Sequence, residues 1–274
     1  MIKFSAFREA VSQPTLNVPK AALYFAREIA YPNLDVSVYL QRLEKLGEDA
    51  AEVISPYLPV FSRAEMLADF LFSERGFQGN TQSYQDPRNS FLNQVIDRRL
   101  GLPITLSVLY VALADQLSIP AVGVGLPGHF VVKIQPPEGE LLLDPFYGGR
   151  LLSEDDCMHL VEASTSFHGP FNRGWLKPVS AQATLTRMLN NLRNIFLTQQ
   201  DWVSALAVLE HLTILQPDIP DLLRDMALLH HQLGELRPAV DYYELYLERT
   251  PSAPDADKMR RNLRLAAQQI ARLN

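Results

Sequence analysis

Apolar residues recur at helical spacing through the first ninety positions. The spacing predicts three amphipathic helices, over Asn17 to Ala30, Asp35 to Ile54, and Ser62 to Phe77. Asn17 and Asp35 are residue types that favour the N-cap, and Ser62 is followed three residues later by Glu65, as in a capping box. Helices with one apolar face are typical of a globular core, so we interpret these three as packing elements.

A polar segment separates these helices from a long apolar one. Residues 76–89 are rich in Gly, Asn, Gln, Ser and Asp, which predicts a loop that leads into a helix from about Ser90 to Leu100. Gly101 to Pro103 then opens an apolar helical run that extends to Leu117. We expect this run to be a buried helix.

The hydrophobic period changes between Ile119 and Leu152. Three short apolar runs, AVGVGL, HFVVKI and ELLLD, are separated by Pro-Gly and Pro-Pro-Glu-Gly turns. This pattern predicts a small antiparallel sheet, and the nearly continuous apolar strands indicate that the sheet packs against the helix that starts at Pro103. Ser153 is placed to cap a further helix.

The carboxy-terminal third contains an internal repeat. Equivalent residues lie 34 positions apart in three places: Ala205 and Ala239, Glu210 and Glu244, Pro217 and Pro251. This is the tetratricopeptide period, and helices over 181–199 and 220–233 align at the same offset. Residues 255–273 are expected to form a capping helix. The groove of a tetratricopeptide array binds peptides or partner proteins, or the array serves only as a scaffold. Trp202 is a candidate binding residue in this part of the chain.

Two repeats are fewer than usually stand alone, so we expect the array to lean on the first domain. The expected domains are residues 1–165, a connector over 166–179, and the repeats over 180–274. The connector carries Phe167, Phe171 and Trp175, whose burial would join both halves into one rigid unit.

Charge and composition exclude several classes of protein. The chain has 274 residues, is 47% hydrophobic and carries a net charge of −6. That charge argues against nucleic-acid and membrane partners. No uncharged apolar run reaches the length of a spanning helix, and the amino terminus has no apolar segment long enough for a signal peptide. We expect a cytoplasmic protein with no cofactor and no metal site. The sequence leaves its oligomeric state open.

An order of elements typical of a catalytic site spans residues 86–152. A helix start at Pro103 is followed by His129 and then by Asp144. Papain-like and transglutaminase-like sites supply a cysteine, a histidine base and an orienting carboxylate in that order. Here Thr105 lies near the helix start and no cysteine does, while Cys157 follows acidic residues that would raise the pKa of its thiol.

Five segments carry a family resemblance: Gly79-Asn80, Asp86 to Val95, Arg98 to Tyr110, Gly125 to Ile134, and Leu141 to Asp156. They resemble the bacterial SirB-type family, in which a transglutaminase-like domain precedes tetratricopeptide repeats. The transglutaminase-like domain also resembles part of a eukaryotic F-box adaptor. The resemblance implies an α+β fold, mainly helical at its N-terminus with a small antiparallel sheet in a transglutaminase- or papain-like core, followed by all-α repeats. It also implies that the cysteine is generally absent.

Three interpretations of His129 and Asp144 remain open. The domain is a former enzyme that binds a protein or peptide partner, as an adaptor or regulator together with the repeats. Alternatively it is a hydrolase or acyltransferase in which Thr105 or Ser107 attacks with His129 as base. In the third, His129 only bonds to Asp144 and locks two strands.

Asn89 and Asn93 are further candidate binding residues, because they flank the helix that leads to Gly101. Both could line the same cleft as His129. The competing explanation, which we favour, is that the two residues cap the helix and anchor the preceding loop.

Overall fold

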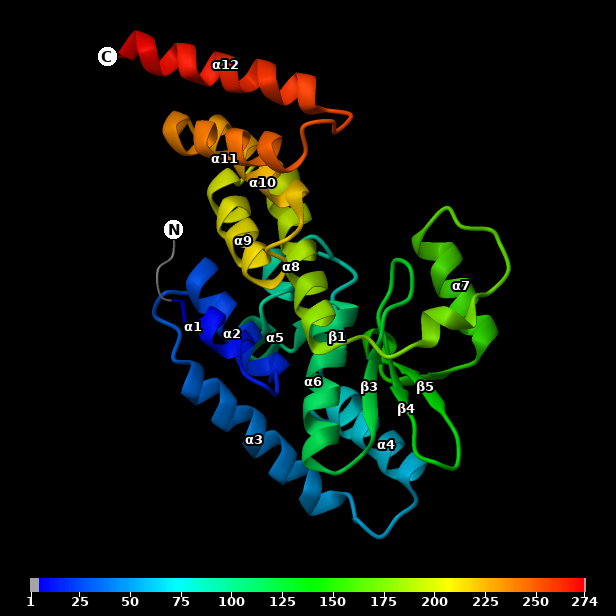
Figure 1. Cartoon of the computed structure of the whole chain (residues 1–274). Coiled ribbons are helices and arrows are strands. Elements are labelled where there is room, and N and C mark those ends of the chain that lie inside the picture. Colours follow the sequence, from blue (N-terminus) through cyan, green and yellow to red (C-terminus); the bar gives the residue numbers. More distant parts are fainter. Residues whose placement is uncertain (1–4, 274) are drawn as a thin grey trace.

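Helix α6 (Pro103–Gln116) runs through the centre of the N-terminal part, and the other elements surround it (Figure 1). The structure is a computed structural model that describes residues 5–273. The first eight residues of α6 are all buried, as expected for a helix that is apolar on every side. Helices α2, α3, α4 and α5 contact it, and so do strands β3 and β4 of the sheet. The predicted α+β fold with C-terminal helical repeats is confirmed.

The α-helices that precede α6 are α1 (Ala6–Val11), α2 (Val18–Ile29), α3 (Val36–Val53), α4 (Val60–Ala68) and α5 (Leu92–Arg98). The predicted caps of α2 and α3 are confirmed, because Asn17 and Asp35 each accept a backbone N–H at 2.9 Å. The predicted start at Ser62 is wrong. Helix α4 begins two residues earlier, because Pro59 takes the N-cap position, and the helix continues into a π-helical turn, η1 (Asp69–Glu74).

The segment predicted as a loop contains two short elements. Strand β1 (Gln78–Gly79) pairs in parallel with β2 (Leu100–Gly101), and a 3-10 turn, η2 (Pro87–Asn89), precedes α5. Helix α5 is shorter than predicted. It ends at Arg98, because Arg99 has a left-handed backbone with φ of 58°.

The main sheet is antiparallel with strand order β3-β4-β5-β6. Its strands are β3 (Ala121–Val124), β4 (Val131–Ile134), β5 (Leu141–Asp144) and β6 (Arg150–Leu152), of which β6 was not predicted. Alternation along the strands gives each face its own core: Val132 and Leu143 belong to the core around α6, and Val131 and Leu142 to a smaller cluster beneath α7 (Glu154–Ser164). Ser153 caps α7 as predicted.

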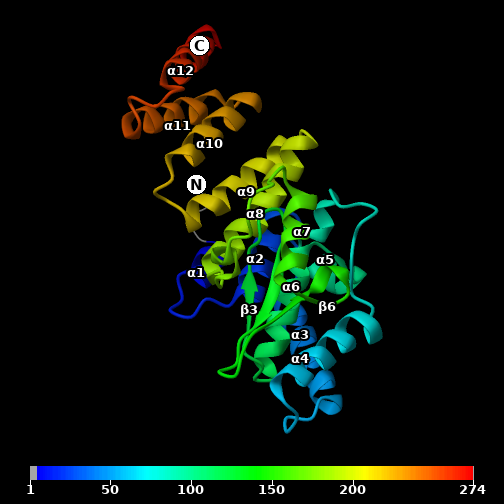
Figure 2. The same ribbon diagram turned by 90° about the vertical axis from the view of Figure 1, so that its right-hand side faces the viewer.

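The repeats form a stack that extends away from the sheet (Figures 1 and 2). Its helices are α8 (Ala181–Thr198), α9 (Trp202–Leu215), α10 (Pro220–Gln232), α11 (Leu236–Arg249) and α12 (Ala256–Leu273). The first pair shares the main core, in which Leu185, Met188 and Leu212 are fully buried. The next helices build a separate cluster around Tyr243 and Met259.

A buried polar contact joins α9 to the N-terminal helices. The Nε2 atom of His211 lies 3.1 Å from Glu28 Oε2, and its Nδ1 lies 2.7 Å from the Ala207 carbonyl oxygen. Glu28 also accepts the Phe7 amide at 3.0 Å, and the Phe7 ring packs against the imidazole. Burial alone would raise the pKa of Glu28, but hydrogen bonds from His211, Ser5 and Phe7 hold it below its usual value.

The connector between the two parts is anchored on the outer side of the sheet. Phe167 and Phe171 each contact Trp175 edge-on, at 5.2 and 5.6 Å between ring centroids, and Phe171 and Trp175 pack against the cluster beneath α7. Phe167 remains 37% exposed. Helices α8 and α9, and not these rings, therefore supply the main contact between the domain and the repeats.

Two findings bear on the membrane-spanning and metal-binding classes of protein considered from the sequence. Within residues 5–273 no helix combines the length and apolarity needed to cross a membrane. The same residues contain no group of three or more His, Cys, Asp or Glu side chains arranged to hold a metal ion.

A fragment spanning residues 180–274 is expected to lose cooperative folding. Leu185, Met188 and Leu212 would lose the cover that α2 and α6 provide, and burial of each such side chain is worth about 1.5–3 kcal/mol. Thermal unfolding by circular dichroism checks this, with the full chain as the control. A sharp transition at the temperature of the full chain would contradict the shared core.

Candidate functional site

His129 and Asp144 meet at one end of the sheet. Strand β3 runs antiparallel to α6, β4 runs in the same direction as α6, and β5 is antiparallel again. The start of β4 and the end of β5 therefore lie at the end of the sheet next to the start of α6. His129 precedes β4 by two residues and Asp144 is the last residue of β5. Their side chains are joined by a hydrogen bond of 3.0 Å between Nε2 and Oδ2, as predicted from the order of elements.

This pair is nearly enclosed. The His129 side chain is 6% exposed and that of Asp144 is fully buried. Phe146 contacts the imidazole edge-on and Tyr147 stacks over it, with ring centroids 6.0 and 6.1 Å away. The second carboxylate oxygen of Asp144 accepts the Phe146 amide at 3.0 Å. The carboxylate therefore fixes both the imidazole and the turn that covers it.

The two candidate hydroxyls lie on opposite faces of α6, because residues two apart on a helix are rotated by about 200°. Thr105 Oγ1 accepts the Leu102 amide and donates to the Asn89 carbonyl oxygen, each at 2.9 Å. Ser107 Oγ donates to the Pro103 carbonyl oxygen at 2.8 Å. Among the hydrogen bonds of residues 5–273, neither hydroxyl bonds to His129. A nucleophilic role for either residue stays a prediction.

The two asparagines are placed apart by the structure. Asn89 anchors the preceding loop: its Nδ2 donates to the Ser83 carbonyl oxygen at 2.8 Å, and its Oδ1 accepts from Asn80 at 3.0 Å. Asn93 lines a cavity with Tyr31 to which Asn89 does not contribute. The buried Oδ1 of Asn93 has no partner within the described chain. The structure thus assigns Asn89 a loop-anchoring contact and does not place the two residues in one cleft.

Cys157 is isolated from solvent. Its side chain is fully buried beneath the sheet, and burial, together with the charges of Asp156, Asp144 and Glu154, raises the pKa of the thiol to about 12. A thiol in this setting stays protonated at neutral pH and is a poor nucleophile. Trp202, the other candidate, opens α9 and packs partly buried against the main core.

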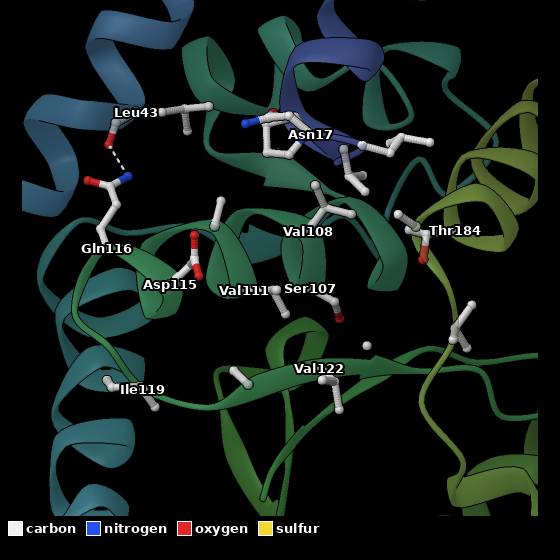
Figure 3. A pocket seen from close by; sticks show the side chains of 18 of the residues that line it. Asn17, Leu43, Ser107, Val108, Val111, Asp115, Gln116, Ile119, Val122 and Thr184 are labelled. Carbon is white, nitrogen blue, oxygen red and sulfur yellow. Dashed lines mark hydrogen bonds between the residues drawn. The ribbon is translucent and has the colours of Figure 1, made fainter. Parts of the chain in front are cut away.

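A cavity of about 560 Å³ lies between α6 and strand β3 (Figure 3). Ser107, Val108 and Val111 line it from α6, and Val122 closes it from β3. The remaining walls come from the start of α2, from α3 and from the first turn of α8, where Thr184 lies. Most of its lining is apolar, and both halves of the chain contribute to it.

Comparison with known proteins agrees with this architecture. The sequence profile of the transglutaminase-like superfamily matches residues 37–190, which is more than half of the chain. The chain belongs to the transglutaminase-like superfamily. A tetratricopeptide-repeat profile matches residues 192–264, so the repeat predicted from the 34-residue period is confirmed.

The curated relatives cover different shares of the chain. A UPF0162 protein of Xylella fastidiosa (strain Temecula1) is 33% identical over 92% of this chain and 91% of its own length. The UPF0162 protein YchA of Escherichia coli K12 is 26% identical over 84% of each chain. F-box only protein 21 of Pongo abelii is 31% identical over 46% of this chain but only 20% of its own length.

Sequence reasoning missed one residue that holds the site of this transglutaminase-like domain together. Arg187, on repeat helix α8, donates from one guanidinium nitrogen to the carbonyl oxygens of Leu126 and His129, at 3.1 and 2.6 Å. Its guanidinium also lies over the Phe130 ring, 5.3 Å from the centroid. A lone arginine on an amphipathic helix gives no local signal of such a contact.

A cysteine placed at Thr105 is expected to stay unreactive. The position is fully buried and its side-chain contacts point to Leu102 and Asn89, so a thiol there would lack both access and a base. Mass spectrometry after iodoacetamide treatment of the native Thr105→Cys variant measures this, with native Cys157 as the internal reference. Rapid alkylation at residue 105 that is lost in a His129→Ala background would instead support a catalytic arrangement.

Proposed function

We propose that this protein is a non-catalytic adaptor or regulator that binds a protein or peptide partner through its transglutaminase-like domain and its first repeat together. One observation carries the proposal: His129 and Asp144 are paired, but the hydroxyls of Thr105 and Ser107 bond to backbone carbonyls and Cys157 is buried elsewhere. A base without a nucleophile in reach performs no acyl transfer. In this proposal the His129–Asp144 pair is a structural lock.

The cavity beside α6 supports the choice of a polypeptide partner. It is large, mainly apolar and lined by both parts of the chain, as expected for a site that receives side chains of a partner. Strand β3, which forms one wall, is the last strand in the order of the sheet, but the connector already bonds to its outer edge: the Gly123 carbonyl oxygen accepts the Val179 amide at 2.9 Å, and Val124 pairs with Pro178. A peptide would therefore be held mainly by apolar side chains that enter the cavity, and less by backbone pairing with β3.

The alternative of a hydrolase or acyltransferase that uses Thr105 or Ser107 has less support. Each hydroxyl would have to leave its present backbone partner and rotate toward His129. The SirB-type assignment and a cytoplasmic location rest on the motifs and composition of the sequence, and both belong to the proposal.

Site-specific photo-crosslinking tests the partner site. With p-benzoylphenylalanine in place of Val122, which lines the cavity, irradiation in the native cells is expected to yield a discrete adduct with one protein. The same substitution at Val53, which is 53% exposed at the end of α3, is the matched control and should yield none. The adduct is identified by mass spectrometry.

A second variant distinguishes cavity binding from random proximity. Ala112→Phe places a ring into the cavity from α6 and should abolish the Val122 adduct without lowering the melting temperature by more than a few degrees. Equal adducts at Val122 and Val53, or an adduct that survives Ala112→Phe, would contradict the proposal.

A further inference from the structure

The hydroxyl groups inside the cavity beside α6 have their hydrogen atoms already engaged. Ser107 donates to the Pro103 carbonyl oxygen at 2.8 Å, and Thr184 donates to the Ser180 carbonyl oxygen at 3.0 Å. Both hydroxyls therefore offer only lone pairs to a ligand. Most of the wall around them is apolar, so the interior of the cavity suits an apolar side chain.

Two carboxylates lie at one end of this cavity. The Gln116 side chain donates from Nε2 to the Leu43 carbonyl oxygen at 3.3 Å, which joins α6 to α3 there (Figure 3). Glu44 follows Leu43 and Asp115 precedes Gln116 in the sequence, and both acidic residues line the cavity and are exposed. This end of the cavity lies away from Thr184 (Figure 3).

These carboxylates have no cationic partner within residues 5–273. The residues that line the cavity include no Lys, Arg or His. Lys45, the residue after Glu44, instead pairs with Glu48 and Asp49 at 3.3 and 3.0 Å. Arg63, which reaches the end of α6, donates to two backbone carbonyl oxygens, each at 2.8 Å. The negative charge at this end of the cavity is therefore open to a ligand that brings a positive one.

We propose that the partner segment that enters this cavity carries a large apolar side chain next to a Lys or Arg residue. The apolar side chain fills the interior between α6 and β3, and the cation pairs with Glu44 and Asp115. An acidic segment of the same apolar content is rejected, because its charge would face both carboxylates. This inference rests on the proposed function and specifies the chemistry of the partner.

Selection from a random peptide library displayed on phage tests this chemistry. The target is the full chain, immobilised through a biotin tag at low ionic strength, and the bound phage are sequenced. Enriched peptides are expected to combine a Leu, Ile, Phe or Trp residue with a Lys or Arg residue beside it. Acidic residues should be depleted relative to the unselected library.

Variants that change charge but not shape make the test specific. A fluorescent copy of an enriched peptide, measured by anisotropy, should bind Glu44→Gln combined with Asp115→Asn about tenfold more weakly and with less salt dependence. Glu52→Gln combined with Glu74→Gln removes the same charge at exposed positions outside the cavity and should leave the affinity nearly unchanged. Selection against Glu44→Lys combined with Asp115→Lys should enrich acidic peptides instead.

The outcomes separate this inference from the proposed function. Enriched peptides without basic residues, or an unchanged affinity for Glu44→Gln combined with Asp115→Asn, would overturn the inference. If such peptides still lose binding to Ala112→Phe, the cavity remains a peptide site and the proposed function stands. If no enriched peptide loses binding to Ala112→Phe, both fail. Self-association of the chain in sedimentation velocity that Ala112→Phe abolishes would make a second copy the occupant, which also overturns the inference.

Discussion

The buried contact between His211 and Glu28 fixes how the first repeat sits on the domain. Both nitrogens of His211 are engaged, Nδ1 with the Ala207 carbonyl oxygen and Nε2 with the Glu28 carboxyl group, so the ring is held at both ends. The imidazole is fully buried, and this pairing is therefore specific as well as costly to break. Around it, apolar residues of α8 and α9 continue the core of α2 and α6. The position of α8 follows from this junction.

The arrangement of α8 in turn determines the cavity beside α6 and the surroundings of His129. Its first turn closes the cavity beside α6, and its next turns carry Arg187 to the loop before β4. The His129–Asp144 pair is thus held from two directions, by the turn that contains Phe146 and by the repeat helix. A transglutaminase-like domain without the repeats would lack one wall of the cavity beside α6 and the contact from Arg187 to the His129 carbonyl oxygen.

Local patterns predicted the elements but not the contacts between them. The caps at Asn17, Asp35 and Ser153, the apolar run of α6 and the 34-residue period each depend on residues close in sequence, and each is confirmed. The two-residue strands β1 and β2 are too short to show a period, and Pro59 displaced the start expected at Ser62.

Long-range contacts at the candidate site had no sequence signal. The order of His129 and Asp144 predicted their hydrogen bond, because a family pattern preserves that order. The bond from Arg187 to His129 joins residues 58 apart, and that from His211 to Glu28 joins residues 183 apart. Thr105 and Ser107 are candidates in sequence, but the phase of α6 sends their hydroxyls to different backbone partners, which only the three-dimensional structure reveals.

Native-state hydrogen exchange of the full chain tests the claim that the first repeat and the domain are one folding unit. Measured in low concentrations of denaturant, the slowest amides of α6 and α9 should share one free energy of opening and one denaturant dependence, because they belong to a single core. Amides of α11, which belongs to the separate outer cluster, should open at lower free energy. Exchange of α9 together with α11, while α6 remains protected, would contradict the account.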